Sequence, residues 1–203
     1  TDGNDGNTGL VNNAAGAWAT IQKAFNSAIA GDTVNFAAGT YSTSGDPTTV
    51  NNGADGSPIV FNGTSGVIWN NAGQTYVLHR YVRLQQIEFN RRLRIQGTNA
   101  HHVQITSNTF SGCTLGSLWL ETIDGQGAPP AGPNNNILAW NTFTNAQAHF
   151  VVLNGYNNRV ASNTFTINNS WDNFRCSGSN QVIVANLFTN ILPTPTNSNH
   201  DAL

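Results

Sequence analysis

The chain has 203 residues and a formal net charge of −2, with 9% charged and 38% hydrophobic residues. This near-neutral balance lacks the basic footprint of a nucleic-acid-binding protein, and it excludes disorder caused by high net charge. No apolar run approaches the ~18 residues that cross a bilayer, so we expect no membrane span. The chain is rich in Asn, Thr and Gly, and Lys23 is its only lysine, a composition that favours an extracellular protein.

The first predicted element is an amphipathic helix at about 19–30. Its apolar positions follow helical spacing and comprise Trp18, Ile21, Phe25, Ala28 and Ile29. Thr20 is a suitable N-cap, Gly31 is a suitable stop, and Lys23 lies on the polar face. A single helix ahead of many short strands would cover the open edge of a strand solenoid and act as its cap.

From residue 84 onward one short motif recurs, in which a Phe lies two positions after an Asn. The asparagines are Asn108, Asn141, Asn163 and Asn186, and the phenylalanines are Phe89, Phe110, Phe143, Phe165 and Phe188. The earliest copy has Ile87 in place of the Asn. The Phe residues are 21, 33, 22 and 23 residues apart, and the long interval contains the Pro- and Gly-rich stretch 125–133.

Repeats of this length predict a solenoid, and their Val-, Ile- and Thr-rich composition indicates strands. About 22 residues per repeat corresponds to one coil of a parallel β-helix, in which equal positions stack about 4.8 Å apart. We therefore predict an all-β fold with a buried Phe ladder and an Asn ladder along one turn.

Three segments, 16–25, 30–34 and 38–41, resemble the N-terminal cap and first coil of the secreted right-handed parallel β-helix proteins of the pectate-lyase-like superfamily. The resemblance covers roughly residues 1–203. It implies a single right-handed parallel β-helix domain, with coils at about 32–203 after the cap helix. The superfamily includes polysaccharide lyases, glycoside hydrolases, phage tailspikes, adhesins and proteins without catalysis, so the resemblance leaves the activity open.

A basic cluster occupies residues 80–94 and contains five of the eight basic residues: Arg80, Arg83, Arg91, Arg92 and Arg94. Guanidinium groups hold uronate or sulfate groups through bidentate hydrogen bonds, and we predict carbohydrate binding at Arg91, Arg92 and Arg94. In a lyase, one arginine would abstract the proton next to the uronate carboxyl group. Strand alternation sends neighbouring residues to opposite faces, so a dispersed, solvated surface is the alternative.

A second candidate site comes from two copies of a ring-Asp-x-apolar pattern, at 171–174 and 200–203. If these copies are in register, Asp172 and Asp201 lie about 5 Å apart on adjacent coils. We predict Asp172, Asp201 and Arg175 as catalytic residues, with Trp171 and His200 contributing to carbohydrate binding. The alternative is that both aspartates cap turns.

No cofactor or metal site is predicted, although a lyase would have a use for Ca²⁺. The run 2–7 resembles a calcium loop superficially, but Asn13 stands where an EF-type loop has its bidentate acidic ligand. His101 and His102 are predicted to point in opposite directions, as consecutive strand residues do. Cys113 and Cys176 are predicted to be unbonded, because two coils separate them by about 10 Å.

Two functions follow from these patterns. The first is an extracellular scaffold that assembles head-to-tail into a filament, sheath or adhesin, because the surface is nearly uncharged and no second cap precedes Leu203. The second is a secreted lyase or hydrolase that acts on an acidic polysaccharide. The expected partner is accordingly another copy of the chain or a polysaccharide.

Overall fold

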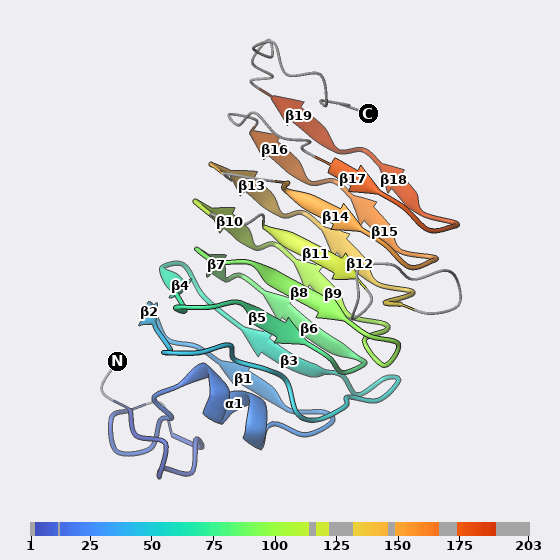
Figure 1. The fold of residues 1–203 in the computed structure, drawn as a ribbon. Helices are drawn as coiled ribbons and strands as arrows, with labels where there is room; N and C mark the ends of the chain where they lie inside the picture. The colour runs from blue at the N-terminus through green and yellow to red at the C-terminus, as the bar shows by residue number, and fades with distance from the viewer. Residues whose placement is uncertain are drawn as a thin grey trace.

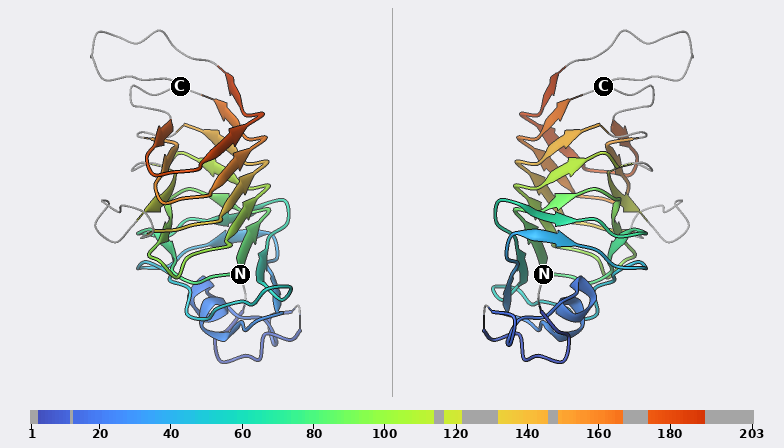
Figure 2. Two further views of the ribbon diagram at one scale, coloured as in Figure 1. Left: turned by 90° about the vertical axis from the view of Figure 1, so that its right-hand side faces the viewer. Right: turned by 90° about the vertical axis from the view of Figure 1, so that its left-hand side faces the viewer.

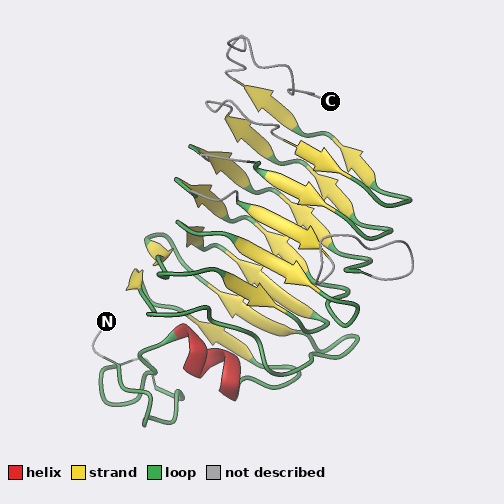
Figure 3. Cartoon of the chain, viewed as in Figure 1, coloured by secondary structure: helices red, strands yellow, loops and turns green. Residues whose placement is uncertain are grey.

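The computed structural model describes residues 3–11, 13–113, 117–121, 132–145, 149–166 and 174–189. Within these ranges one α-helix precedes nineteen short strands. The strands form three parallel sheets, and successive coils lie on top of one another as a β-helix (Figure 1). The helix lies at the N-terminal end of the stack (Figure 3). The predicted all-β parallel β-helix with one N-terminal helix is confirmed.

Each coil passes through the sheets in the order A, B, C. Sheet A consists of β1 (Thr33–Asn35), β3 (Ile59–Asn62), β6 (Val82–Gln85), β9 (Gln104–Thr106), β12 (Ile137–Ala139), β15 (Arg159–Ala161) and β18 (Val182–Val184). Sheet B consists of β2 (Gly39–Tyr41), β4 (Val67–Trp69), β7 (Glu88–Phe89), β10 (Thr109–Ser111), β13 (Thr142–Thr144), β16 (Thr164–Thr166) and β19 (Leu187–Thr189). Sheet C consists of β5 (Thr75–Val77), β8 (Leu93–Gln96), β11 (Leu118–Glu121), β14 (Val151–Leu153) and β17 (Phe174–Cys176).

The coil length is read directly from the register of sheet A. Paired residues on neighbouring strands are 27, 23, 21, 33, 22 and 23 positions apart in the sequence. Four of these six intervals agree with the predicted repeat of about 22 residues, the first is longer, and the interval of 33 contains the Pro- and Gly-rich stretch 125–133. The stacking of the coils is clear from both sides of the molecule (Figure 2). The coils predicted beyond residue 189 lie outside the described residues.

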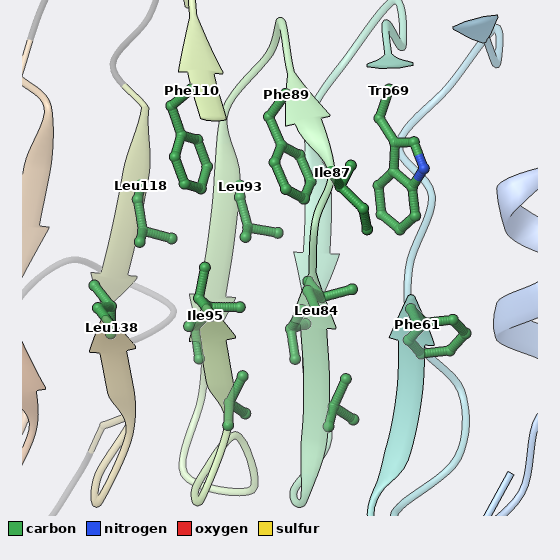
Figure 4. Close-up of a cluster of buried hydrophobic side chains, with 14 of the residues drawn as sticks. Phe61, Trp69, Leu84, Ile87, Phe89, Leu93, Ile95, Phe110, Leu118 and Leu138 are labelled. Carbon is green, nitrogen blue, oxygen red and sulfur yellow. The ribbon is translucent and has the colours of Figure 1, made fainter. Parts of the chain in front are cut away.

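The core contains the predicted aromatic ladder. Seven inward positions of sheet B are in register: Tyr41, Trp69, Phe89, Phe110, Phe143, Phe165 and Phe188. Neighbouring Phe rings from Phe89 to Phe188 stack 4.7–5.0 Å apart, with interplanar angles of at most 11°. Figure 4 shows part of this ladder beside the aliphatic residues of sheets A and C. Phe188 differs from the prediction because, in the last described coil, it is only partly buried.

The asparagine ladder is also confirmed, and its hydrogen bonds explain why the repeat needs this residue. The side-chain oxygen of each Asn accepts the backbone N–H of the corresponding residue one coil earlier, as Asn141 does from Asn108 at 3.0 Å. The side-chain amide donates to a buried carbonyl of the same earlier coil, as Asn141 does to Ile105 at 2.8 Å. The ladder thus satisfies the backbone groups that each turn would otherwise bury unpaired.

A second amide ladder lies at the turn between sheets C and A and was not predicted. The backbone N–H of Val103 donates to Asn136 at 2.8 Å, that of Asn136 to Asn158 at 3.0 Å, and that of Asn158 to Gln181 at 3.1 Å. Each of these three amide side chains lies two residues before an inward aliphatic residue of sheet A. This regular spacing is a sequence signal for the second ladder.

The cap helix α1 (Ile21–Ser27) is shorter than the predicted 19–30. Thr20 is the N-cap, as predicted, and its side chain accepts the backbone N–H of Lys23 at 3.1 Å. The helix ends early because Ala28 is extended, and Ile29 is 60% exposed instead of lying on the buried face. Gly31, with φ of +92°, therefore serves the turn into β1 and does not stop the helix.

The segment before the helix is held by Asp5, whose carboxylate accepts hydrogen bonds from the Ala19 and Thr20 N–H groups and the Thr20 hydroxyl. Burial alone would raise the pKa of Asp5, but these hydrogen bonds and nearby Lys23 hold the pKa below its usual value. Asp5 is thus a structural brace for the cap. In the described chain, no helix has the length and apolarity that crossing a membrane would take.

Candidate functional site

The outer face of sheet C carries two of the predicted site residues in one row. Its strands pair so that Tyr76, Arg94, Trp119, Val152 and Arg175 occupy one continuous row. The residues beside Arg94 in β8, Leu93 and Ile95, are fully buried, which confirms that Arg94 is on the outer face. Arg94 and Arg175 are three strand spacings apart along the axis, a distance of about 14 Å.

Arg94 is held in place by Tyr76. Its guanidinium carbon lies 5.5 Å from the centre of the Tyr76 ring, and one guanidinium nitrogen donates to the Tyr76 hydroxyl at 3.4 Å. A cation over an aromatic face is attracted by the ring quadrupole, so the guanidinium stays against the sheet instead of extending into solvent. Arg175, on the last described strand of sheet C, is exposed. Within this row, the guanidinium of Arg94 contacts Tyr76, whereas the side chain of Arg175 is exposed to solvent.

Arg91 and Arg92 lie in the turn that leads into β8, at the margin of the same face. The Arg91 side chain donates to the Asn90 carbonyl at 3.1 Å, and the Arg92 carbonyl accepts the Thr75 N–H at 2.9 Å. Both residues are half-buried. Four of the eight basic residues of a chain with net charge −2 thus belong to sheet C or its margin.

The rest of the basic cluster lies elsewhere. Arg83 is on the outer face of sheet A, where its side chain donates to Gln104 at 2.9 Å. Arg80 is exposed in the turn from sheet C to sheet A. The cluster of five therefore divides between two faces of the molecule, because the chain passes from sheet A through sheet B to sheet C between Arg83 and Arg94, and not because of alternation within a strand.

The predicted aspartate pair is not tested by the structure. Trp171, Asp172, His200 and Asp201 lie outside the described residues, so the separation of the two carboxyl groups is not defined. Only Arg175 of that group is described, on β17. Its position in the row with Arg94 is defined by the strand register and does not depend on the aspartates.

The histidine pair differs from its prediction. His101 and His102 lie in a turn, and His102 has a φ of +54°, so the chain reverses and the two rings meet with their Nδ1 atoms 2.7 Å apart. Burial, then the neighbouring His102 and Arg80, lower the pKa of His101. His102 stacks on Tyr81 at 4.9 Å and borders a cavity of about 300 Å³ that also contains Arg83 and Asp55. Among the described residues, no three His, Cys, Asp or Glu side chains come together as metal ligands do.

Both cysteines are free, as predicted. Cys113 is fully buried, and its thiol donates to the Phe89 carbonyl at 3.4 Å. Burial raises the pKa of Cys113 to about 12. This thiol is therefore a packing residue and not a nucleophile.

Sequence reasoning missed Tyr76 and Trp119 as members of the row on sheet C. A signal was present, because each is the middle residue of a strand triplet, Thr-Tyr-Val at 75–77 and Leu-Trp-Leu at 118–120, just as Arg94 is at 93–95. In a solenoid the middle residue of such a triplet faces outward. A polar or aromatic residue at that position is therefore a candidate for surface recognition.

No family model and no curated protein matches this chain. Among solved structures, ORF18 of Geobacillus virus E2 superposes with a TM-score of 0.59 at 13% identity, covering 82% of this chain and 44% of the viral one. A mannuronic acid-specific polysaccharide lyase of family 6 from human gut microbiota superposes with a TM-score of 0.46 at 15% identity, covering 80% of this chain and 54% of the lyase. The chain thus spans about half the length of each protein, and what it shares with the viral protein is the parallel β-helix fold.

Proposed function

We propose that the protein is an extracellular β-helix scaffold that binds an acidic polysaccharide along the outer face of sheet C. The observation that carries the proposal is the row that places Arg94 and Arg175 in register on that face. Arg91 and Arg92 add two cations at its margin, while the chain as a whole has a net charge of −2. The positive charge is therefore concentrated on sheet C, where Arg175 is exposed, Arg94 is half-buried and Val152 between them is buried.

The spacing of the cations favours a polymer over a small anion. A single carboxylate or sulfate contacts one guanidinium, whereas two arginines about 14 Å apart are bridged only by a chain with repeated negative groups. Arg94 covers one face of the Tyr76 ring, and the proposal assigns the other, apolar face to packing against a sugar ring. The row thus combines the two kinds of contact that an acidic polysaccharide needs.

The described residues support binding more directly than catalysis. Arginine stays protonated at any ordinary pH, so Arg94 and Arg175 hold anions well but are poor general bases. Lys23, the single lysine of the chain, lies on the cap helix and not on sheet C. Lyase or hydrolase activity would depend on Asp172 and Asp201, and it stays a prediction, as does head-to-tail assembly.

The test is binding of polygalacturonate, alginate and chondroitin sulfate, measured by affinity electrophoresis and calorimetry. We expect Arg94→Gln and Arg175→Gln each to weaken the binding of at least one of these polymers about tenfold or more, because a charged hydrogen bond contributes about 1.5–3 kcal/mol. Arg159→Gln is the matched control, since Arg159 is exposed on sheet A. Failure of the wild-type protein to bind any of the polymers, or an equal effect of the control, would refute the proposal. Release of unsaturated uronate would instead support the lyase.

A further inference from the structure

The turn between sheets A and B contains a residue that the fold does not explain. In five successive coils this turn has one residue with positive φ, between 54° and 58°, and these residues are Gln86, Ser107, Trp140, Ser162 and Ala185. Four of them are small or polar. Trp140 is the exception, and a bulky side chain is rare in this backbone region because of the steric cost.

Burial of the Trp140 side chain does not offset the steric cost of its positive φ. Its side chain is 65% exposed, the highest value among the large apolar residues that the structure describes from the first coil onward. Ser107 and Ser162 serve the same turn in the neighbouring coils, so a serine at 140 would be sufficient for folding. A strained residue that the core does not need is a reason to look for a function.

A groove lies along the same edge of the molecule, in the coils that precede Trp140. It has a volume of about 360 Å³, and its polar lining consists of Thr64, Ser65, Gln86, Glu88, Ser107 and Thr109. The backbone N–H of Ser107 donates to the Ala139 carbonyl at 3.1 Å, so Ser107 and Trp140 occupy equivalent positions on adjacent coils, about 4.8 Å apart. The lining of the groove therefore ends at Ser107, one coil before the exposed indole.

The lining indicates the chemistry of a ligand. Hydroxyl and amide groups both donate and accept hydrogen bonds, which suits a molecule rich in hydroxyls. The single charged residue in this lining is Glu88, whose carboxylate disfavours an anion. An exposed indole supplies the flat apolar surface on which one face of a sugar ring packs.

We propose that this edge is a binding site for a neutral polysaccharide, with one sugar stacked on Trp140 and the adjacent sugars hydrogen-bonded in the groove. Because each coil has three sides, the edge between sheets A and B lies opposite sheet C. The site is therefore separate from the arginine row, and the proposal does not depend on binding of an acidic polymer there. A protein partner seated on Trp140 is the competing interpretation, and the same experiment addresses it.

The experiment titrates the protein with galactomannan and mixed-linkage β-glucan, and with hexasaccharides from each, while tryptophan fluorescence and gel retardation are recorded. We expect the wild-type protein to bind at least one polymer with a shift in emission, and Trp140→Ser to lose at least tenfold in affinity. Glu88→Gln should change the affinity less, because it retains a hydrogen-bonding group. Leu10→Ser is the control for loss of an exposed apolar side chain, since Leu10 is 87% exposed.

Thermal melting completes the test. Since serine occupies the same turn in two neighbouring coils, Trp140→Ser should melt at the wild-type temperature or above it. Three results would overturn the proposal: no binding of either neutral polymer at millimolar sugar concentration, unchanged affinity in Trp140→Ser, or a clearly lower melting temperature. The first would favour the protein partner, and the last would show that the fold needs the indole.

Discussion

Replacing Asn141 by alanine should remove one rung of the asparagine ladder and destabilise the β-helix strongly. Asn141 is 1% exposed. Its side chain accepts the backbone N–H of Asn108 at 3.0 Å and donates to the Ile105 carbonyl at 2.8 Å. Alanine offers neither a donor nor an acceptor, so both backbone groups would be left buried without a partner.

The size of the effect follows from these two groups. An unsatisfied buried donor or acceptor costs about 1–3 kcal/mol, so two of them cost about 2–6 kcal/mol. That is a large fraction of the total stability of about 5–15 kcal/mol that is typical of a domain. Loss of the contacts between Asn141 and the ladder amides of Asn108 and Asn163 adds to the cost.

Urea unfolding, followed by tryptophan fluorescence and circular dichroism, measures this loss. Asn186→Ala is the matched control, because Asn186 makes the same two backbone hydrogen bonds but is only partly buried, in the last described coil. Water can reach the groups that this variant exposes, so the loss should be less than half of that for Asn141→Ala. A loss below about 1 kcal/mol for Asn141→Ala would refute the reasoning that the ladder satisfies buried backbone groups.

Three further outcomes are expected. Phe143→Ala should cost about 3–5 kcal/mol in urea unfolding and Phe188→Ala less, because Phe143 is fully buried in the stack; equal losses would contradict the ladder. Asp5→Ala should lower the melting temperature above pH 4, where the wild-type carboxylate with its lowered pKa is charged, and the difference should vanish as the pH falls through that pKa; a difference that persists at pH 2 would contradict the bracing role. At pH 8 a thiol reagent should label Cys176 in the native protein and Cys113 only after denaturation, because the pKa of Cys113 is about 12; rapid native labelling of both would show that Cys113 is not buried.

The fold was predictable because stacking imposes the same demand on every coil. An inward position must be filled by a side chain of similar size and a turn must satisfy the same backbone groups, so Phe and Asn recur where the structure needs them. The second ladder was harder to see because Asn and Gln both satisfy it, and the earlier coils use Val103 and Val82 instead. The end of the helix was misplaced because Gly31 is a good stop, yet the chain leaves the helix at Ala28.

The candidate site was predictable by residue type but not by arrangement. Arg94 and Arg175 are 81 positions apart, across three coils of unequal length. An error of one residue in any coil would move one arginine to the inner face, so spacing alone could not place the two in one row. Strand register, which depends on packing of the whole solenoid, was needed to bring them together.

The dependence of affinity on oligosaccharide length tests the central claim, that an acidic chain lies across sheet C between these two arginines. Oligogalacturonates of increasing length would be titrated into the wild-type protein and into Arg175→Gln by calorimetry. The account predicts that wild-type affinity rises steeply once the oligosaccharide can span about 14 Å, and that Arg175→Gln removes this rise while leaving the affinity for the shortest oligosaccharides unchanged. A wild-type affinity that does not depend on length, or a rise that persists in Arg175→Gln, would contradict it.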